Sequence, residues 1–255
     1  MRRVALLVGL VALLSAATAS AELTQRGNIF IRFDGGITPR SLPRDSLAPI
    51  GVRIEGTIRA PARQEPPALR KIRVALNTAG KLDTRGLPVC PETRIKTISS
   101  AEALATCGSA LVGAGGMTAV TSLPEQPDFL LRAEILLFNS VVDGRAAILG
   151  HIYQHSPVPN TKLVVFHVSR SPGTFGTVLE ATLPKSVNRN GYLKSIYLQL
   201  QRNFVFRGRQ HSYLSASCAA PRGFTAASFP FARASMTFDG GRTLSSTLVR
   251  SCRVR

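Results

Sequence analysis

Residues 129–153 read FLLRAEILLFNSVVDGRAAILGHIY, two apolar runs that are separated by Asp143-Gly144. An Asp-Gly pair between two such runs is typical of the tight turn of a β-hairpin. The arrangement recurs near the C-terminus, where Asp239-Gly240-Gly241 separates ARASMTF from RTLSSTLV. These two places therefore predict antiparallel β-structure.

Apolar and polar side chains alternate with a period of two in several other segments. Such alternation is typical of strands that bury one face. The clearest examples are residues 52–59 (VRIEGTIR), 72–77 (IRVALN) and 195–200 (SIYLQL). With the remaining runs, the chain has about eleven or twelve strands, which predicts an all-β antiparallel sandwich of Greek-key or jelly-roll type.

The stretch CPETRIKTISSAEALATC, residues 90–107, contains the single helix that we predict. Ser99 and Glu102 have the S-x-x-E spacing of a capping box, and Gly108 can end the helix. A short helix near residues 100–107 is therefore expected, with Cys107 at its end. Cys90 lies in the proline-containing loop that leads to it.

The four cysteines, Cys90, Cys107, Cys218 and Cys252, are spaced too widely for a C-x2–4-C zinc site or a C-x-x-C redox site. An even number of cysteines predicts disulfides in a chain that is exported, as the N-terminus of this one indicates. Four cysteines allow three pairings. The capped helix returns Cys107 toward the loop that bears Cys90. We therefore predict Cys90–Cys107 and, by elimination, Cys218–Cys252.

The N-terminus has the features of a secretory signal peptide: Arg2 and Arg3, an apolar run, and a small-residue site that ends at Ala21. The apolar run is shorter than the roughly 20 residues that span a bilayer. We expect cleavage before Glu22, with residues 1–21 removed. Residues 22–255 are then expected to be secreted, extracellular or associated with the cell wall, as a single sandwich domain; the alternative is two subdomains that divide near residues 125–155.

The chain is strongly basic, with a formal net charge of +18. Residues 145–255 carry 15 basic side chains and two acidic ones, a net charge of +13. Such an excess attracts polyanions, and in an exported protein these are anionic envelope polymers or lipid headgroups. The candidate contacts are Arg202, Arg207 and Arg209 in QRNFVFRGRQHSY, residues 201–213, which resembles a hairpin with a basic turn. The alternative is that the arginines are dispersed, solvated residues.

Other site types are not favoured. His151 and His155 have H-x-x-x-H spacing, but on a strand they lie about 13 Å apart, too far to share a zinc ion. We predict no metal or cofactor, and, because aromatic residues are few and tryptophan is absent, no specific nucleic-acid binding. Nucleophile, P-loop and dinucleotide motifs are missing, so a non-enzymatic role is expected. The alternative is a carboxylate-dependent hydrolase, to which the basic half contributes only Glu180 and Asp239.

Four segments carry a resemblance to a known group of proteins: LDTRGLPVCP, CGSALVGAG, HSYLSASC and GGRTLSSTLVRSC. They resemble exported actinobacterial proteins of unknown function that have four cysteines. The resemblance implies a shared disulfide-stapled fold, and it implies no ligand or activity. The leading hypothesis is therefore a basic, secreted protein of the cell envelope that binds an anionic polymer or lipid through its C-terminal half.

Overall fold

The computed structural model describes residues 21–61, 64–122, 125–183 and 191–255. Most of the predicted signal peptide, residues 1–21, lies outside these ranges. Within them, no helix is both long enough and apolar enough to cross a membrane.

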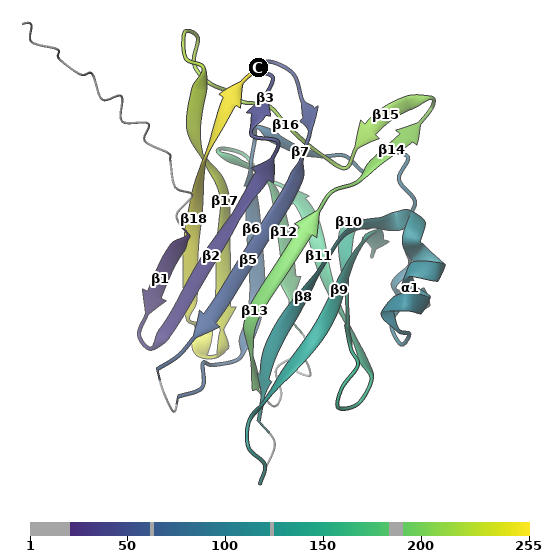
Figure 1. Ribbon diagram of the computed structural model, residues 1–255, viewed down its shortest axis with the longest axis vertical. Coiled ribbons are helices and arrows are strands. Elements are labelled where there is room, and N and C mark those ends of the chain that lie inside the picture. Colours follow the sequence, from purple (N-terminus) through teal and green to yellow (C-terminus); the bar gives the residue numbers. More distant parts are fainter. Residues whose placement is uncertain (1–20, 62–63, 123–124, 184–190) are drawn as a thin grey trace, which may run out of the picture.

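The described residues form an all-β, sandwich-like fold, as predicted (Figure 1). The longer strands are β2 (Ile29–Thr38), β5 (Gly51–Arg59), β6 (Leu69–Asn77), β8 (Leu111–Thr121), β9 (Phe129–Val142), β10 (Arg145–Gln154), β11 (Asn160–Arg170), β12 (Phe175–Thr182), β13 (Gly191–Leu200), β17 (Ala226–Phe238) and β18 (Thr243–Val254). The shorter strands are β1 (Glu22–Arg26), β3 (Ser41–Leu42), β4 (Ala48–Pro49), β7 (Gly80–Leu82), β14 (Asn203–Phe206), β15 (Arg209–Ser212) and β16 (Leu214–Ala216). The helices are α1 (Ser100–Cys107) and the 3-10 turns η1 (Glu92–Arg94), η2 (Gly108–Ala110) and η4 (Asp239–Gly241). The predicted strand number matches the longer set, because the shorter strands have too few residues to show a periodic pattern.

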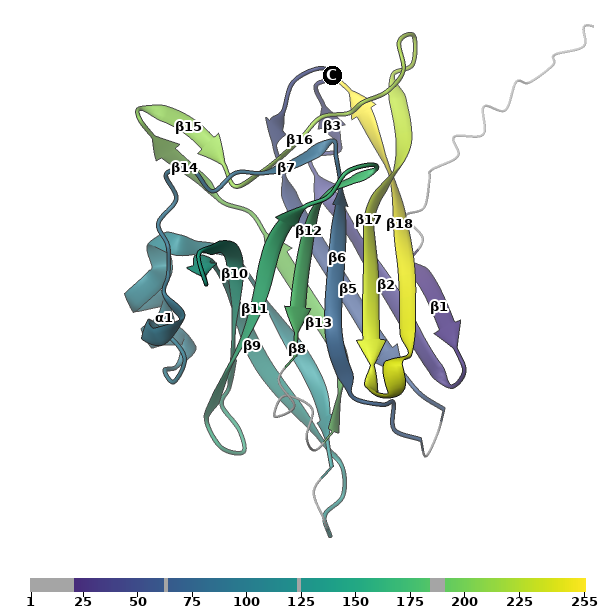
Figure 2. The same ribbon diagram turned by 180° about the vertical axis from the view of Figure 1, so that it is seen from behind.

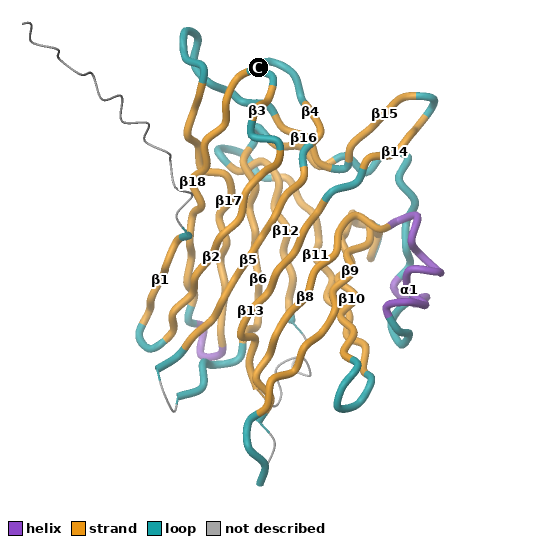
Figure 3. The backbone as a smooth tube through the Cα atoms, in the orientation of Figure 1, coloured by secondary structure: helices purple, strands orange, loops and turns teal. Residues whose placement is uncertain are grey.

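One 13-stranded sheet has the order β1-β2-β5-β13-β8-β9-β10-β11-β12-β6-β17-β18-β3. The sheet curls so that its first strands face its last ones, as the opposite views of Figures 1 and 2 show. The tube in Figure 3 shows that loops gather at the two ends of the strands. Strands β8, β9, β10 and β11, which extend to both sides of residues 125–155, are consecutive hydrogen-bonded neighbours in this sheet.

The main core lies between the two layers, because the alternating apolar side chains of both point inward. Ile37 of β2 and Val52 of β5 belong to the same buried cluster as Val74 of β6, Leu179 of β12 and Leu248 of β18. Burial of such side chains contributes roughly 1.5–3 kcal/mol each.

The two edges of the curled sheet meet along β1 and β18. Glu22 Oε2 accepts hydrogen bonds from Ser246 Oγ and from the Thr247 N–H, each at 3.0 Å. Arg26 Nη1 donates to the Thr243 carbonyl at 3.0 Å. Side chains therefore join the edges where the sheet order places no backbone ladder.

Helix α1 has the capping box that the sequence predicted. The Ser99 N–H donates to Glu102 Oε2 at 2.8 Å, and Ser99 Oγ accepts from the Glu102 N–H at 3.3 Å. The helix covers the outer face of β9 and β10 and forms a separate cluster with them. Its buried members are Cys90, Ile95, Ala103, Cys107, Ala110, Leu136, Phe138 and Leu149.

Both disulfides pair as predicted. Cys90 and Cys107 have Cα atoms 5.5 Å apart and staple the loop before α1 to the end of the helix. Cys218, which follows β16, is bonded to Cys252 of β18, with Cα atoms 5.7 Å apart. Each bond lies in a buried cluster, so both bonds fix segments that pack on the sheet.

Candidate anion-binding site

The hairpin β14–β15 carries two of the three arginines that the sequence singled out. Its turn is Arg207-Gly208, with φ angles of 51° and 72°. Two consecutive residues with positive φ define the turn type that matches the twist of a two-stranded hairpin. The hairpin extends away from the curled sheet, above α1 (Figure 1). Arg207 and Arg209 are both exposed on it.

Aromatic rings hold this hairpin in place. Phe204 stacks on His211 with ring centroids 5.6 Å apart, and Phe206 contacts the same imidazole edge-on. Phe206 also lies against the backbone of Gly86, where an added Cβ would be 2.1 Å from the ring. The Arg207 guanidinium lies 5.2 Å from the Phe206 centroid. Packed aromatic side chains of the hairpin therefore lie next to the basic turn and support it.

Arg202 lies at the base of the hairpin and not at its tip. Its carbonyl accepts from the N–H of Tyr213, a fully buried residue whose own carbonyl accepts from the Asp83 N–H. Burial raises the pKa of the Tyr213 hydroxyl. Arg202 Nη2 donates to the Ser109 carbonyl at 3.4 Å. The structure thus brings Arg207 and Arg209 together and holds Arg202 about 16 Å away along the strand.

None of these three arginines belongs to an ion pair among the described residues. The two acids of the basic half are instead engaged elsewhere. Glu180 pairs with Lys71 at 2.7 Å, and Asp239 pairs with Arg70. Acidic groups of the C-terminal half therefore neutralise basic groups of the N-terminal half, which leaves the hairpin charge uncompensated.

The basic excess of residues 145–255 does not occupy one layer of the fold. Strand β13 lies between β5 and β8, whereas β17 and β18 belong to the opposite layer. Basic side chains of the C-terminal half are thereby distributed over the surface. The predicted basic half is therefore a property of the sequence, and the hairpin is one place in it where two exposed arginines lie close together.

The histidines have separate environments. His151 is fully buried under the segment before α1, with Nε2 2.9 Å from the Ile98 carbonyl. His155 is exposed, and its Nε2 lies 3.4 Å from Glu134 Oε1. Across the described residues, no three His, Cys, Asp or Glu side chains are grouped so that they could hold a metal ion.

The described carboxyl groups with resolved shifts have lowered pKa values. The Arg85 guanidinium lowers the pKa of Asp83 to about 2, chiefly through a side-chain hydrogen bond. The Ser99 backbone N–H and hydroxyl lower the pKa of Glu102. A general acid needs a pKa near the working pH, so neither group is suited to that role.

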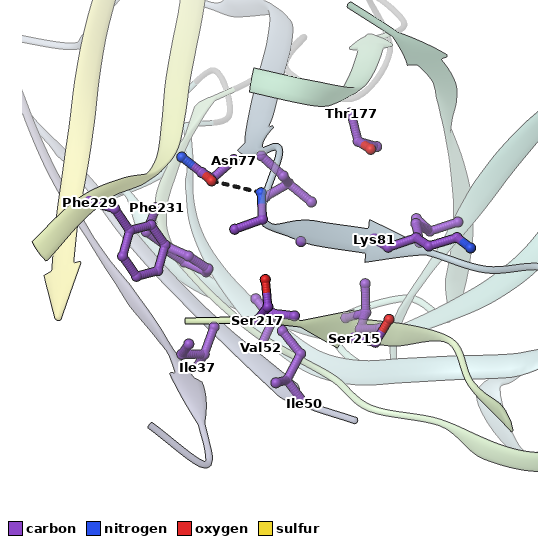
Figure 4. A pocket seen from close by; sticks show the side chains of 16 residues that line it. Ile37, Ile50, Val52, Asn77, Lys81, Thr177, Ser215, Ser217, Phe229 and Phe231 are labelled. Carbon is purple, nitrogen blue, oxygen red and sulfur yellow. Dashed lines mark hydrogen bonds between the residues drawn. The ribbon is translucent and has the colours of Figure 1, made fainter. Parts of the chain in front are cut away.

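A small, partly open pocket lies between the layers, beneath β7 and β16 (Figure 4). Its volume is about 40 Å³, and its lining is mostly apolar, with Phe229 and Phe231 on one side. The Asn77 amide at its edge is already used, because Nδ2 donates to the Pro230 carbonyl and Oδ1 accepts from the Ala79 N–H. The space suits a few water-sized groups.

The fold and the hairpin define a class: an all-β, sandwich-like protein with two disulfides and an uncompensated basic hairpin. No protein-family model matches the chain, and no curated protein and no solved structure matches it.

Proposed function

We propose that this chain is an exported, non-enzymatic protein of the cell envelope that binds an anionic polymer through the β14–β15 hairpin. The observation that carries the proposal is the exposure of Arg207 and Arg209 at one turn without an acidic partner among the described residues. Guanidinium groups form charge-assisted, often bidentate hydrogen bonds with phosphate and carboxylate oxygens.

Three features support export. The sequence begins with a predicted signal peptide, and two disulfides are typical of oxidising compartments. Strand β1 begins at Glu22, which is the residue that the predicted cleavage would leave first. The resemblance to exported actinobacterial proteins belongs to the same proposal.

The acids of the basic half do not favour hydrolysis, because Glu180 and Asp239 are both held in ion pairs. A glycosidase needs two carboxyl groups that face a substrate, one of them protonated. Carboxylates that neutralise Lys71 and Arg70 are not available for that chemistry. Binding of a polyanion requires no carboxylate of the protein, since the ligand itself supplies the negative charge that faces the hairpin arginines.

Retention on an anionic polymer, with salt as the variable, tests the proposal. Purified protein is applied to immobilised polyphosphate and, separately, to vesicles with anionic lipid, between about 50 and about 300 mM salt. Affinity for the polymer should fall steeply with salt, and the variant Arg207→Gln/Arg209→Gln should lower the log–log salt slope by about 1–2.

The matched control is Arg170→Gln/Arg253→Gln, which removes the same charge from two exposed arginines on other strands. An equal loss in this control would replace the hairpin by a general charge effect. Retention that is indifferent to salt would contradict the electrostatic mechanism. Binding to vesicles alone would assign the hairpin to lipid headgroups instead of a polymer.

A further inference from the structure

Two shallow depressions lie next to each other along β8 on the outer face of the sheet, and together they are called the β8 groove. Its floor contains Ala114 and Gly116, which carry only a methyl group and a hydrogen. Across the ladder, Ala114 lies opposite Gln199 of β13, and Gly116 lies opposite Tyr197. Two open depressions of about 470 and 490 Å³ adjoin here, and Tyr197 lines both. The groove therefore combines a floor of small residues with one aromatic wall.

The groove is long enough for an extended chain. It is lined by β8 residues from Leu111 to Thr118, which corresponds to about 23 Å of strand. The neighbouring strands β5, β13, β8 and β9 lie side by side on one face of the molecule (Figure 1). They are interior members of the sheet, so a ligand here meets side chains and not an open edge.

Tyr197 presents its ring to this groove. The side chain points outward from β13 and is 41% exposed. Its hydroxyl donates to Gln199 Oε1 at 3.1 Å, which lays the ring along the strand. A flat apolar face with a polar tip is complementary to a sugar ring, whose C–H face is apolar and whose rim carries hydroxyls. The Gln199 and Gln201 amides beside it can donate to and accept from such hydroxyls.

An arginine lines each end of the groove. Arg132 of β9 is exposed at the Thr118 end, and Arg202 lies at the Leu111 end. Neither arginine belongs to an ion pair of the described residues. Two carboxylates lie nearer the middle of the groove. Glu55, across from Tyr197, is paired with Arg53 at 3.5 Å, and Glu134, across from Gly116, lies 3.4 Å from His155. The ends are therefore basic, and they complement carboxylates on the ligand.

Other ligand classes fit less well. Single-stranded nucleic acid requires several aromatic platforms, and among the described residues Tyr197 is the only aromatic one that lines either depression. An added peptide strand requires an open sheet edge, which β8 does not have.

We propose that the β8 groove binds a polysaccharide that carries carboxylates, with one sugar ring stacked on Tyr197 and carboxylates at Arg132 and Arg202. This site is separate from the hairpin tip and does not depend on Arg207 or Arg209.

Titration with oligogalacturonate, its methyl-esterified form and polyphosphate tests the assignment. Tyr197→Ala should weaken oligogalacturonate binding about tenfold, whereas Tyr197→Phe should retain most of it. Ala114→Gln, which fills the floor from an exposed position, should also weaken binding, and Arg132→Gln should reduce the preference for the free carboxylate form. Melting temperatures of the variants should stay near that of the wild type, because all of these positions are at the surface.

Oligogalacturonate binding that is absent, or that is unchanged in Tyr197→Ala, would overturn the proposal. Equal affinity for the esterified form would overturn the carboxylate assignment. If Arg207→Gln/Arg209→Gln abolishes polyphosphate binding while oligogalacturonate still binds through Tyr197, both proposals hold. If only the hairpin variant affects any of the three probes, the groove proposal fails and the hairpin proposal remains.

Discussion

Arg250 of β18 donates from Nη2 to Asp34 Oδ1 of β2 at 2.5 Å, and so joins the first and last long strands of the chain. Arg250 Nε also donates to the Gly35 carbonyl at 2.5 Å. The Arg250 side chain is 6% exposed. This pair, of which only the arginine is buried, joins β2 and β18, which approach each other without being adjacent in the backbone ladder.

Arg250→Met should lower the free energy of unfolding by about 1.5–3 kcal/mol, because the Asp34 carboxylate, which is 20% exposed, loses its charge-assisted hydrogen bond with the guanidinium. Asp34→Asn should cost less, since an amide oxygen can still accept from the guanidinium. The exposed Arg253 on the same strand provides the control, and Arg253→Met should change stability by less than about 0.5 kcal/mol. Chemical denaturation measures all three, and equal midpoints for Arg250→Met and Arg253→Met would contradict the role of the pair.

Loss of either disulfide should destabilise the protein to a comparable degree. The bonds have sequence separations of 17 and 34 residues, which correspond to about 3 and about 3–4 kcal/mol in the chain-entropy model. Cys90→Ser/Cys107→Ser and Cys218→Ser/Cys252→Ser should each lower the melting temperature by several degrees. Peptide mapping without reduction checks the pairing, and a Cys90–Cys218 or Cys90–Cys252 peptide would contradict it.

Stability should fall in mild acid because of His151. Burial lowers the pKa of its imidazole below the ordinary 6.5, and Nδ1 is buried without a hydrogen-bond partner among the described residues. Below about pH 6.5 the unfolded chain therefore binds a proton at His151 more readily than the folded protein does. The free energy of unfolding has its full contribution from neutral His151 above about pH 6.5, and this contribution is lost as the pH falls below that value. Denaturation at about pH 7.5 and about pH 5 measures the loss.

His151→Gln should show a smaller loss between the two pH values than the wild type. His211→Gln, at a partly exposed histidine, serves as the control. A wild-type loss that persists in His151→Gln would assign the acid sensitivity to other groups.

Adjacent glycines of β8 should respond differently to alanine. A Cβ at Gly115 would lie 1.9 Å from the Tyr197 carbonyl oxygen, whereas a Cβ at Gly116 would have its nearest contact at 3.4 Å, the Ala133 carbonyl oxygen. Gly115→Ala should therefore destabilise the protein by about 1–3 kcal/mol or more, and Gly116→Ala should change stability much less. Thermal unfolding compares the two directly, and equal melting temperatures would show that β8 and β13 can separate at this point.

Features that depend on residues close together along the chain were predictable from the sequence. The turn at Asp143-Gly144 consists of two residues that adopt positive φ readily, and in the turn at Arg207-Gly208 the glycine does so. The cap at Ser99 depends on Glu102 three positions later, and the first disulfide closes a loop of 17 residues. The outward position of Tyr197 also followed from its alternation with Ile196 and Leu198.

What surrounds Tyr197 was not predictable in the same way. Gly116 and Ala114 lie next to it only because β13 inserts between β5 and β8, and no local pattern specifies that order. An exposed tyrosine on the polar side of a strand was the available signal, and it does not reveal a groove without its cross-strand neighbours.

The sequence by itself determined the all-β class, the capped helix, both disulfides and the basic hairpin, because these depend on local backbone preferences, side-chain periodicity or the few pairings open to four cysteines. The tertiary structure alone decided which charges are neutralised and where a groove forms. Lys71 meets Glu180, Arg70 meets Asp239, and Asp34 meets Arg250 across separations of more than 100 residues. Those contacts exist only after the sheet has curled and brought distant strands together, since an ion pair is set by distance in space and the sequence pattern carries no record of it.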